Sequence, residues 1–485
     1  MAGYLLLTGS TGLLGQFLVR DLLAKGHRLA LLVRGSKHES AAERIEKILQ
    51  RWERKSGARL PRPVILEGDI RQSFLGLNAT DLKWVRSHCN ALMHSAASLK
   101  FLADGTGEPW ISNLDGTTHM LSLCKASGIR NLHYVSTAYV CGLREGIIYE
   151  SELQCGQSFR NDYEESKLKA EMLIRQADFI DELTIYRPAV IAGDSQTGYT
   201  NTYHGIYLYL RLMALLVPRQ PIGPDGRRQT RLRLPMTGDE RRNIIPVDWV
   251  SNVIASLYTN KNAHGHTFHL APDQCLTPRQ IIEAGYNYFN STGVEYAGYA
   301  KIDPATYNDF EAEMLPAFGM YNNYESTDPH FDCSNLKRFA SGIPCPAIDE
   351  KMLQTFIRYG EKDRWGKRRH SKVHVDYSAS EYFRKFPTED VTHPNNKSRV
   401  SLDLSGPGGG QWTLWLHKDG SVKCERGLNS EPDSLVRLPT DEFRRTTLSS
   451  NGSMDYHAIE QFFPMSVKTF MSTVNTPTEP EPANR

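Results

Sequence analysis

The chain has 485 residues with 57 basic and 55 acidic side chains, and this near-neutral balance argues against a nucleic-acid or membrane-surface binder. One hydrophobic core rarely supports such a length, so we expect two or three domains. The eight cysteines are scattered without a Cys-x-x-Cys pair, and no apolar run is long enough to span a bilayer. Because the first apolar run is short and leads directly into a glycine turn, we do not expect it to be a signal peptide. These features predict a cytoplasmic protein with reduced thiols, no transmembrane segment and no metal site.

The first residues predict a strand, a glycine turn and a helix. The apolar run 4–7 leads to Gly9, Gly12 and Gly15, and a helical segment follows at 16–25. Glycines at this spacing let the backbone turn tightly and approach a pyrophosphate, which then faces the free amides of the helix. Because the glycines lie between a strand and a helix, we predict a dinucleotide-binding site here.

Strand and helix patterns alternate through the first half of the chain. We expect strands at 28–33, 64–66, 91–94, 132–135 and 183–186, and helices at 41–55, 113–126 and 163–177. Repeated strand–helix units predict an α/β fold, with a Rossmann-type, doubly wound parallel sheet covered by helices on both faces.

The alternation stops at about 197–243, which hold an aromatic, apolar segment and then a loop rich in proline, glycine and arginine. Long excursions often form lids or substrate-binding regions. The pattern resumes with a helix at 250–258 and a strand at 266–270, and helical segments continue to residue 359. We therefore expect one large domain over 1–360, with a smaller substrate-binding region inside it.

The sequence pattern changes after residue 360. A charged segment, 361–376, contains Lys367-Arg368-Arg369-His370 and is typical of a solvated linker, with a localisation signal or a phosphate-binding patch as alternatives. Alternating segments separated by glycine turns predict a small α+β domain over 377–472. The tail at 473–485 is rich in Pro, Thr and Glu, and we expect it to be disordered.

Residues after the predicted strands indicate which dinucleotide binds. Arg34 follows the second strand, where an acidic residue would select NAD and an arginine accommodates a 2′-phosphate, so we predict NADP(H). Asp69 follows the third strand and suits either the adenine edge or a turn. Ser95, Ala96 and Ala97 follow the fourth strand, where small side chains suit either a nearby cofactor or tight packing.

A catalytic group is predicted around a tyrosine and a lysine. Tyr163 and Lys167 are four residues apart at a helix start, so they share one helix face. A free tyrosine has a pKa of about 10, and a neighbouring ammonium lowers the pKa by favouring the phenolate. Ser136 and Thr137 end a strand, where a hydroxyl can hold a substrate oxygen beside the phenol.

Together these segments resemble the extended short-chain dehydrogenases/reductases, and within them the thioester reductase and fatty acyl reductase branch. The matching segments follow the family's order and are 8–15, 33–34, 68–69, 94–97, 113–117, 135–138, 161–171, 186–188 and 245–248. The C-terminal segment 400–445 resembles part of a sterol-carrier-type lipid-binding domain.

The resemblance implies roles for individual residues. Tyr163 is the proton donor, Lys167 lowers its pKa and binds the nicotinamide ribose, and Thr137 aligns the substrate oxygen. Asn113 holds the helix geometry near the site or caps the helix, and Pro188 with the residues after it lines the nicotinamide face. The implied cofactor contacts are Gly9, Ser10, Thr11, Gly12, Leu13, Leu14, Gly15, Arg34, Asp69, Ile70, Ser95, Ala96, Ala97, Asn113, Ser136, Tyr163, Lys167, Pro188, Ala189 and Val190.

The leading hypothesis is an NADPH-dependent reductase of an acyl thioester, carried by coenzyme A or an acyl-carrier protein, that yields an aldehyde or alcohol. A set of arginines suits either phosphates of that carrier or a solvated loop, namely Arg227, Arg228, Arg231, Arg233, Arg241 and Arg242. One alternative is an NADP-dependent dehydrogenase or reductase of a hydroxylated or keto lipid, such as a sterol. Another is a lipid-binding or redox-sensing protein without turnover.

Overall fold

The computed structural model describes residues 3–36, 38–299, 302–318, 327–368, 375, 377–388, 398–417, 421–448, 455 and 457–462. Its contacts divide the chain into two compact units, residues 1–6, 22–67 and 372–485 in one and residues 7–21 and 68–371 in the other. The tail predicted to be disordered lies outside the described residues. Among those residues, no helix has both the length and the apolar character needed to cross a bilayer.

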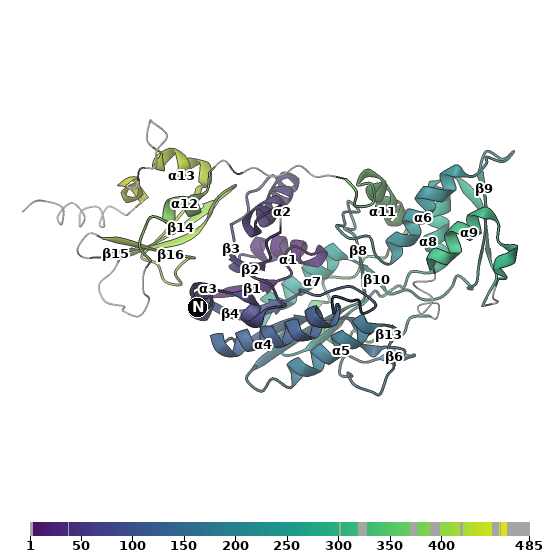
Figure 1. The fold of residues 1–485 in the computed structure, drawn as a ribbon, viewed down its shortest axis with the longest axis horizontal. Helices are drawn as coiled ribbons and strands as arrows, with labels where there is room; N and C mark the ends of the chain where they lie inside the picture. The colour runs from purple at the N-terminus through teal and green to yellow at the C-terminus, as the bar shows by residue number, and fades with distance from the viewer. Residues whose placement is uncertain are drawn as a thin grey trace, which may run out of the picture. The chain divides into compact units, whose positions relative to one another are not determined.

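A seven-stranded parallel sheet organises the fold. Its strands are β1 (Tyr4–Thr8), β2 (Leu29–Val33), β3 (Val64–Glu67), β4 (Cys89–His94), β5 (Asn131–Val135), β7 (Glu182–Pro188) and β11 (Thr267–Leu270). They lie in the order β11-β7-β5-β4-β1-β2-β3, and Figure 1 labels β1, β2, β3 and β4. The chain moves outward from β1 through β2 and β3, and then in the other direction from β4, so the predicted doubly wound topology is confirmed.

Helices follow the strands as the alternation predicted. They are α1 (Leu13–Ala24), α2 (Ala41–Ser56), α3 (Ala79–His88), α4 (Gly116–Ser127), α5 (Asp162–Arg175), α7 (Val247–Thr259) and α10 (Ser334–Ala340). A π-helical turn, η2 (Ile111–Asp115), precedes α4, where the sequence predicted one continuous helix. The helices α4 and α5 pack side by side (Figure 1). The Ser251 hydroxyl of α7 donates to Asp21 Oδ2 of α1 at 2.6 Å, so a polar contact joins these two helices.

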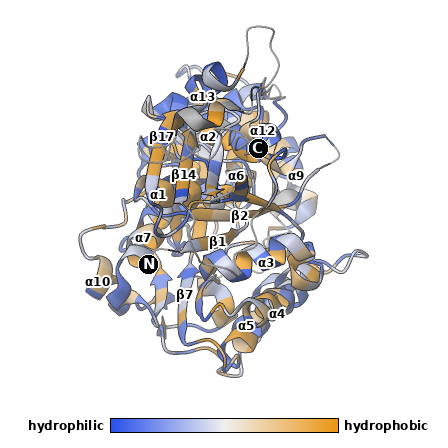
Figure 2. Cartoon of the chain, turned by 90° about the vertical axis from the view of Figure 1, so that its left-hand side faces the viewer, coloured by the Kyte–Doolittle hydropathy of each residue, from blue (hydrophilic) through white to orange (hydrophobic). Residues whose placement is uncertain are grey.

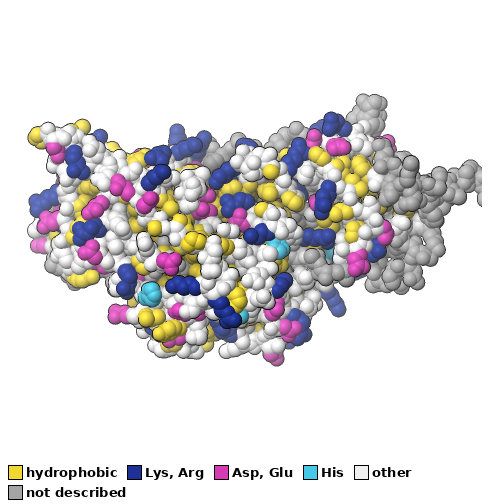
Figure 3. Space-filling view, turned by 180° about the vertical axis from the view of Figure 1, so that it is seen from behind, with side chains coloured by type: hydrophobic (Ala, Val, Ile, Leu, Met, Phe, Trp, Pro, Cys, Tyr) yellow, Lys and Arg dark blue, Asp and Glu magenta, His cyan; other side chains and the backbone are white. Residues whose placement is uncertain are grey.

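The core of the sheet is apolar along whole strands. All five residues of β1 and all five of β2 are buried, and Figure 2 shows both strands in the colour of hydrophobic residues. Strands of a parallel sheet are covered on both faces, so they appear as continuous apolar runs. On the face drawn in Figure 3, by contrast, positive and negative side chains intermingle, in keeping with the near-neutral composition.

The region predicted as a lid contains regular structure. The apolar segment forms α6 (Ile206–Leu216), which packs with α8 (Pro278–Tyr288) and α11 (Glu350–Lys362). The arginine-rich part was expected to be a loop, but it contains β9 (Arg228–Leu234), which pairs in parallel with β12 (Ser291–Tyr296). That expectation was wrong because charged residues alternate in β9 with residues that are fully buried.

Short elements complete the first 360 residues. They are β6 (Ile147–Ile148), β8 (Val190–Ala192), β10 (Ile244–Pro246), α9 (Asp309–Phe318) and β13 (His330–Phe331). Strand β8 pairs in parallel with β10, and β6 pairs in parallel with β13. The β8–β10 pair begins two residues after β7 ends, so it follows the carboxyl end of that strand.

A small C-terminal sheet is present, as predicted. Its strands are β14 (Ser398–Ser405), β15 (Gly410–Leu416), β16 (Val422–Arg426) and β17 (Ser434–Pro439), in the order β16-β15-β14-β17, with the helices α12 (Ala379–Phe383) and α13 (Thr440–Thr447). In the core, the Phe383 ring stacks on Trp412 at 4.4 Å and on Phe443 at 5.5 Å. The domain boundaries at 361–376 and 472 remain predictions.

Tyr4 joins β1 to the C-terminal sheet within one compact unit. Its hydroxyl donates to Gln411 Oε1 at 2.7 Å and accepts from the Leu428 amide at 2.8 Å. Its side chain is 1% exposed, and both partners are buried, so water has little access to replace either bond.

Tyr4→Phe should lower the free energy of unfolding by about 1–3 kcal/mol, because a buried carbonyl and a buried amide lose their partner. Chemical unfolding followed by circular dichroism measures this change. Tyr149→Phe, at a side chain that is 49% exposed, serves as the matched control. Equal unfolding midpoints for the Tyr4 variant and the unaltered protein would contradict the assigned bonds.

Candidate functional site

The glycine loop between β1 and α1 leaves no room for a side chain at Gly9 or Gly15. A Cβ on Gly9 would lie 2.6 Å from the Ala96 amide nitrogen, and one on Gly15 would lie 2.0 Å from the Gly9 carbonyl oxygen. Gly9 also has a left-handed backbone, with φ of 74°. The buried Ser10 hydroxyl has no hydrogen-bond partner among the described residues. A tight turn, an unpaired hydroxyl and the free amides of a helix fit the phosphates of a dinucleotide.

Thr8 ties the end of β1 to the end of β4. Its Oγ1 accepts hydrogen bonds from the amides of Ser95 at 3.2 Å and Ala96 at 3.3 Å, and lies 2.9 Å from His94 Nδ1. The predicted segment of small residues after β4 is therefore packed against the glycine loop. Close approach of the two backbones explains why these positions hold small side chains.

The structure places Asp69 and Ile70 after β3, with partners of their own. The Asp69 carboxylate pairs with Arg71, whose Nη2 lies 2.7 Å from Oδ2. The Ile70 carbonyl is hydrogen-bonded to His119 Nδ1 at 3.0 Å. These contacts shape the turn, and the predicted contacts of both residues with the adenine end of a cofactor remain predictions.

Arg34 follows β2 as predicted, and the structure adds a second arginine. Arg44 of α2 donates to the Arg34 carbonyl. Burial, and then the Arg34 charge, lower the pKa of Arg44. Two guanidinium groups that repel one another suit a doubly charged phosphate. The Glu67 carboxylate lies at the same turn, where a Cβ on Gly35 would be 2.4 Å from its Oε1. Since this negative charge would disfavour a phosphate, selection of the 2′-phosphate remains a prediction.

Thr137 and Tyr163 come together between β5 and α5. The Asn161 side chain caps α5 by accepting from the Glu164 amide at 3.0 Å, which places Tyr163 in the first turn. The Thr137 side chain lies close enough to Tyr163 to lower its pKa. Burial raises the pKa of Tyr163 to about 12, and the Thr137 side chain opposes that rise. The structure thus forms the predicted pair of hydroxyls but not the predicted lowered pKa.

Lys167 is turned toward a different tyrosine. Its Nζ donates to the Tyr134 hydroxyl at 2.7 Å and to the Val135 carbonyl at 2.9 Å. Burial lowers the pKa of Lys167 to about 7, and the Glu171 carboxylate opposes this shift. The pKa that moves toward neutrality is therefore that of the lysine, because its ammonium is held among buried groups.

Tyr134 is the residue that the sequence analysis missed. Its side chain is fully buried, and its ring stacks on that of His94 at 5.8 Å. His94 in turn reaches Thr8, so packed and hydrogen-bonded groups connect Lys167 with the glycine loop. A tyrosine in a strand that is buried on both faces requires a partner for its hydroxyl, and this rule was the available signal.

A buried ion pair lies beneath the catalytic group. The Ser136 hydroxyl donates to Glu171 Oε2 at 2.7 Å, and Arg187 Nη2 donates to Glu171 Oε1 at 2.6 Å. Burial alone would raise the pKa of Glu171, but the charges of Arg187 and Arg175 hold it below its usual value. Because the Ser136 hydroxyl is engaged with Glu171, its predicted cofactor contact would come from the backbone.

Asn113 joins three segments around the site. Its Oδ1 accepts from the Ser98 amide at 2.8 Å, and its Nδ2 donates to the Ser98 carbonyl at 3.2 Å and to the Ser166 hydroxyl at 3.0 Å. Ser166 directly precedes Lys167 in α5. Asn113 lies inside η2, so of the two predicted roles the structure shows the one that holds local geometry.

The segment after β7 borders the hydroxyl pair. Thr137 Oγ1 lies 3.5 Å from the Pro188 carbonyl oxygen. The Ala189 amide donates to the Leu270 carbonyl at 2.9 Å, and Val190 begins β8. Pro188 therefore lies beside Thr137, and the expectation that Pro188 with the residues after it lines the nicotinamide face remains a prediction.

Most of the arginines in the region predicted as a lid, residues 197–243, form hydrogen bonds or ion pairs with other parts of the protein. Arg228 donates to the Gln220 carbonyl at 3.0 Å, and Arg233 pairs with Glu311 at 2.7 Å. Arg227 and Arg241 also donate to backbone carbonyls. These contacts favour a structural role for the group over the predicted contacts with phosphates.

Comparison with known proteins gives a family match and several relatives. The family model described as "Male sterility protein" matches residues 7–254. "Aldehyde reductase lnaA" of Aspergillus flavus is 25% identical over 397 residues, which are 74% of this chain and 36% of the relative. "Non-canonical nonribosomal peptide synthetase FrzA" of Cladobotryum sp is 22% identical over 401 residues, which are 74% of this chain and 36% of the relative. The chain thus spans about a third of the length of these relatives.

Solved structures share the fold. The terminal R domain of the myxalamid PKS-NRPS pathway has a TM-score of 0.59 and 25% identity, covering 76% of this chain and 92% of that domain. The reductase (R) domain of a Mycobacterium tuberculosis nonribosomal peptide synthetase has a TM-score of 0.54 and 17% identity, and the match covers 75% of this chain and 93% of that domain. These matches confirm the resemblance to short-chain dehydrogenases/reductases of the thioester reductase type. They do not confirm the sterol-carrier resemblance.

Lys167 should titrate near pH 7 in the protein without cofactor, and Tyr134→Phe should lower that pKa by roughly one to two units. The ammonium loses a hydrogen-bond acceptor, and such a bond to a charged group contributes about 1.5–3 kcal/mol. Nitrogen NMR of labelled lysines measures the pKa, with Lys167→Arg to assign the signal. The other titratable groups around the ammonium are His94, Tyr163 and Glu171.

Tyr186→Phe is the matched control. It removes an equally buried hydroxyl that is hydrogen-bonded to His133 at 3.0 Å on the neighbouring strand. This variant should leave the Lys167 pKa where it is. An unchanged pKa in Tyr134→Phe, or equal shifts in both variants, would contradict a specific bond between Tyr134 and Lys167.

Proposed function

Because the chain belongs to the male sterility protein family, we propose that it is an NADPH-dependent reductase of an acyl thioester, with an aldehyde or alcohol as product. The observation that supports this proposal best is the proximity of the Thr137 hydroxyl to Tyr163, whose pKa it lowers, one helical turn before the buried Lys167. Relatives named as an aldehyde reductase and as R domains support a reductive reaction on a carrier-bound acyl group.

The hydroxyl pair is suited to hold a carbonyl oxygen. A substrate oxygen between Thr137 and Tyr163 would accept a hydrogen bond from each, and these bonds strengthen as negative charge develops on the oxygen. A reduced nicotinamide dinucleotide, with its phosphates at the glycine loop, supplies a hydride when bound. The pKa of Tyr163, raised to about 12 by burial, keeps its proton in place until a more basic oxygen forms.

The products follow from the atoms exchanged. The carbonyl carbon gains hydride, its oxygen gains the Tyr163 proton, and the resulting thiohemiacetal breaks its carbon–sulfur bond to give aldehyde and thiol. A second hydride and proton convert the aldehyde to an alcohol. The tyrosinate that remains on Tyr163 takes a proton from solvent.

Two arginines support selection of NADPH. Arg34 follows β2 and Arg44 donates to its carbonyl, so both cations lie where a dinucleotide fold places the adenosine ribose. A 2′-phosphate would relieve the repulsion between the two guanidinium groups. The Glu67 carboxylate would favour a ribose hydroxyl instead, so the balance of charge at this turn decides the preference.

Tyr163→Phe should lower kcat for NADPH-dependent reduction of a long-chain acyl thioester by at least about a hundredfold, the usual range for a lost proton donor. NADPH absorbance measures the rate, and fluorescence should show unchanged NADPH binding. If the protein instead oxidises a hydroxylated lipid with NADP and reduces no thioester, the dehydrogenase alternative replaces this proposal.

Replacing Arg34 and Arg44 by alanine should weaken NADPH binding by roughly ten- to a hundredfold and leave NADH binding nearly unchanged, since charge-assisted bonds are lost only to the phosphate. Binding titrations with both cofactors measure the preference. Arg54→Ala, at an exposed position of the same helix, controls for the loss of charge. Equal weakening of NADPH and NADH would remove these arginines from the phosphate site.

A further inference from the structure

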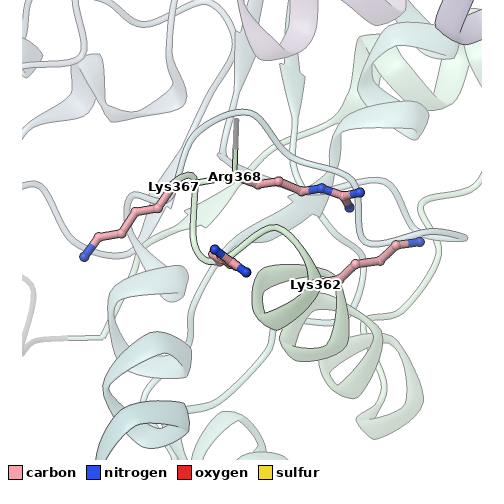
Figure 4. A pocket seen from close by; sticks show the side chains of 4 residues that line it. Lys362, Lys367 and Arg368 are labelled. Atoms are coloured by element: carbon pink, nitrogen blue, oxygen red, sulfur yellow. The ribbon is translucent and has the colours of Figure 1, made fainter. Parts of the chain in front are cut away.

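A pocket at the end of α11 is lined by positive side chains alone. It has a volume of about 520 Å³ and is formed by Lys362, Arg364, Lys367 and Arg368 (Figure 4). Lys362 and Arg368 extend toward the same side, whereas Lys367 extends to the other. Lys367 and Arg368 belong to the basic run 367–370, for which the sequence allowed a solvated linker, a localisation signal or a phosphate-binding patch.

The neighbouring acids are directed elsewhere. Glu361 accepts a hydrogen bond from the Tyr288 hydroxyl at 2.7 Å, and Asp363 accepts one from the Tyr203 hydroxyl at 2.7 Å. In the part of the chain that the structure describes, the four pocket side chains form no ion pair. The C-terminal end of a helix carries roughly half a negative charge, which four cations exceed, so the pocket attracts anions.

The backbone that carries the cations is held in an uncommon conformation. Arg364 and Trp365 both have φ of 52°, and Gly366 has φ of 84°. Non-glycine residues rarely adopt this left-handed conformation, and tertiary contacts must hold them there. The Trp365 ring packs over Gly360, where a Cβ would lie 2.6 Å from it, and against Tyr203 at 5.7 Å. The packing of Trp365 therefore fixes the turn that carries the basic side chains.

The helix that ends in this turn is connected to the glycine loop. The Tyr359 ring of α11 packs against Tyr199 at 5.6 Å, and the Tyr199 hydroxyl donates to Gln16 Oε1 at 2.8 Å. The Asn201 side chain donates to the Thr11 carbonyl at 3.3 Å. One segment, residues 199–203, thus contacts both the support of the pocket and the loop assigned to the dinucleotide.

We propose that this pocket binds a phosphate group of the pantetheine arm that carries the acyl thioester. The inference rests on the proposed function, because that function supplies a substrate with such an arm. Coenzyme A offers phosphates on its pantetheine and on its ribose, and a carrier protein offers the single phosphodiester that attaches the arm. Lysine ammonium and arginine guanidinium groups bind either source by charge-assisted hydrogen bonds.

The test uses the full chain with Lys362→Glu and Arg368→Glu combined. Its matched control combines Lys351→Glu with Arg358→Glu, which make the same charge change at exposed positions of α11 outside the pocket. The substrates are one acyl group on coenzyme A, on 4′-phosphopantetheine and on N-acetylcysteamine, which has no phosphate. The pocket variant should raise KM at least about tenfold for the phosphorylated thioesters and leave kcat and KM for the phosphate-free one unchanged.

The outcomes separate the sources and the proposals. A larger rise in KM for coenzyme A than for phosphopantetheine assigns the pocket to the ribose phosphate, and equal rises assign it to the phosphate of the arm. Unchanged KM values with intact turnover overturn the pocket and leave the proposed function in place. If no thioester is reduced, calorimetry with 4′-phosphopantetheine tests the pocket separately. Loss of binding in the pocket variant alone supports the phosphate site, and equal binding by the pocket variant and the control variant contradicts it.

Discussion

The arrangement of the candidate site depends on an ammonium group kept out of water. Lys167 is 1% exposed, and its charge is tolerated because the Tyr134 hydroxyl and the Val135 carbonyl accept its protons. Glu171 adds a favourable charge from the same helix, and Arg187 holds Glu171 ionised in turn. Removing any one of these partners would reduce the compensation that the buried charge receives.

The same contacts join the catalytic group to the dinucleotide loop. Tyr134 stacks on His94, and His94 contacts Thr8. Thr8 accepts a hydrogen bond from the amide of Ala96, which follows β4 and lies beside Gly9. The carboxyl ends of β1, β4 and β5 therefore form one connected surface. Parallel strands deliver their ends to a common edge, and a dinucleotide site and a proton donor can meet there without a long loop between them.

Local patterns predicted what local physics determines. The buried strands, the glycine turn and the shared face of Tyr163 and Lys167 follow from periodicity and spacing. Tertiary partners could not be found this way, because Tyr134 lies on a different element from its partner Lys167, and Arg44 on a different element from Arg34. The sequence of β9 was interpreted as a loop because its arginines alternate with the buried residues and mask the strand pattern. The lowered pKa expected for Tyr163 was wrong, because burial outweighs the effect of Thr137 and the Lys167 ammonium donates to Tyr134 instead.

Transfer of deuterium tests the central claim most directly. The unaltered protein is given NADPH labelled at each face of nicotinamide C4 in turn, together with an acyl thioester, and the product is analysed by mass spectrometry. The account predicts one deuterium on the former carbonyl carbon per hydride transferred, from one labelled face only, with release of free thiol. Aldehyde or alcohol without deuterium from either face, or no thioester reduction at all, would contradict it.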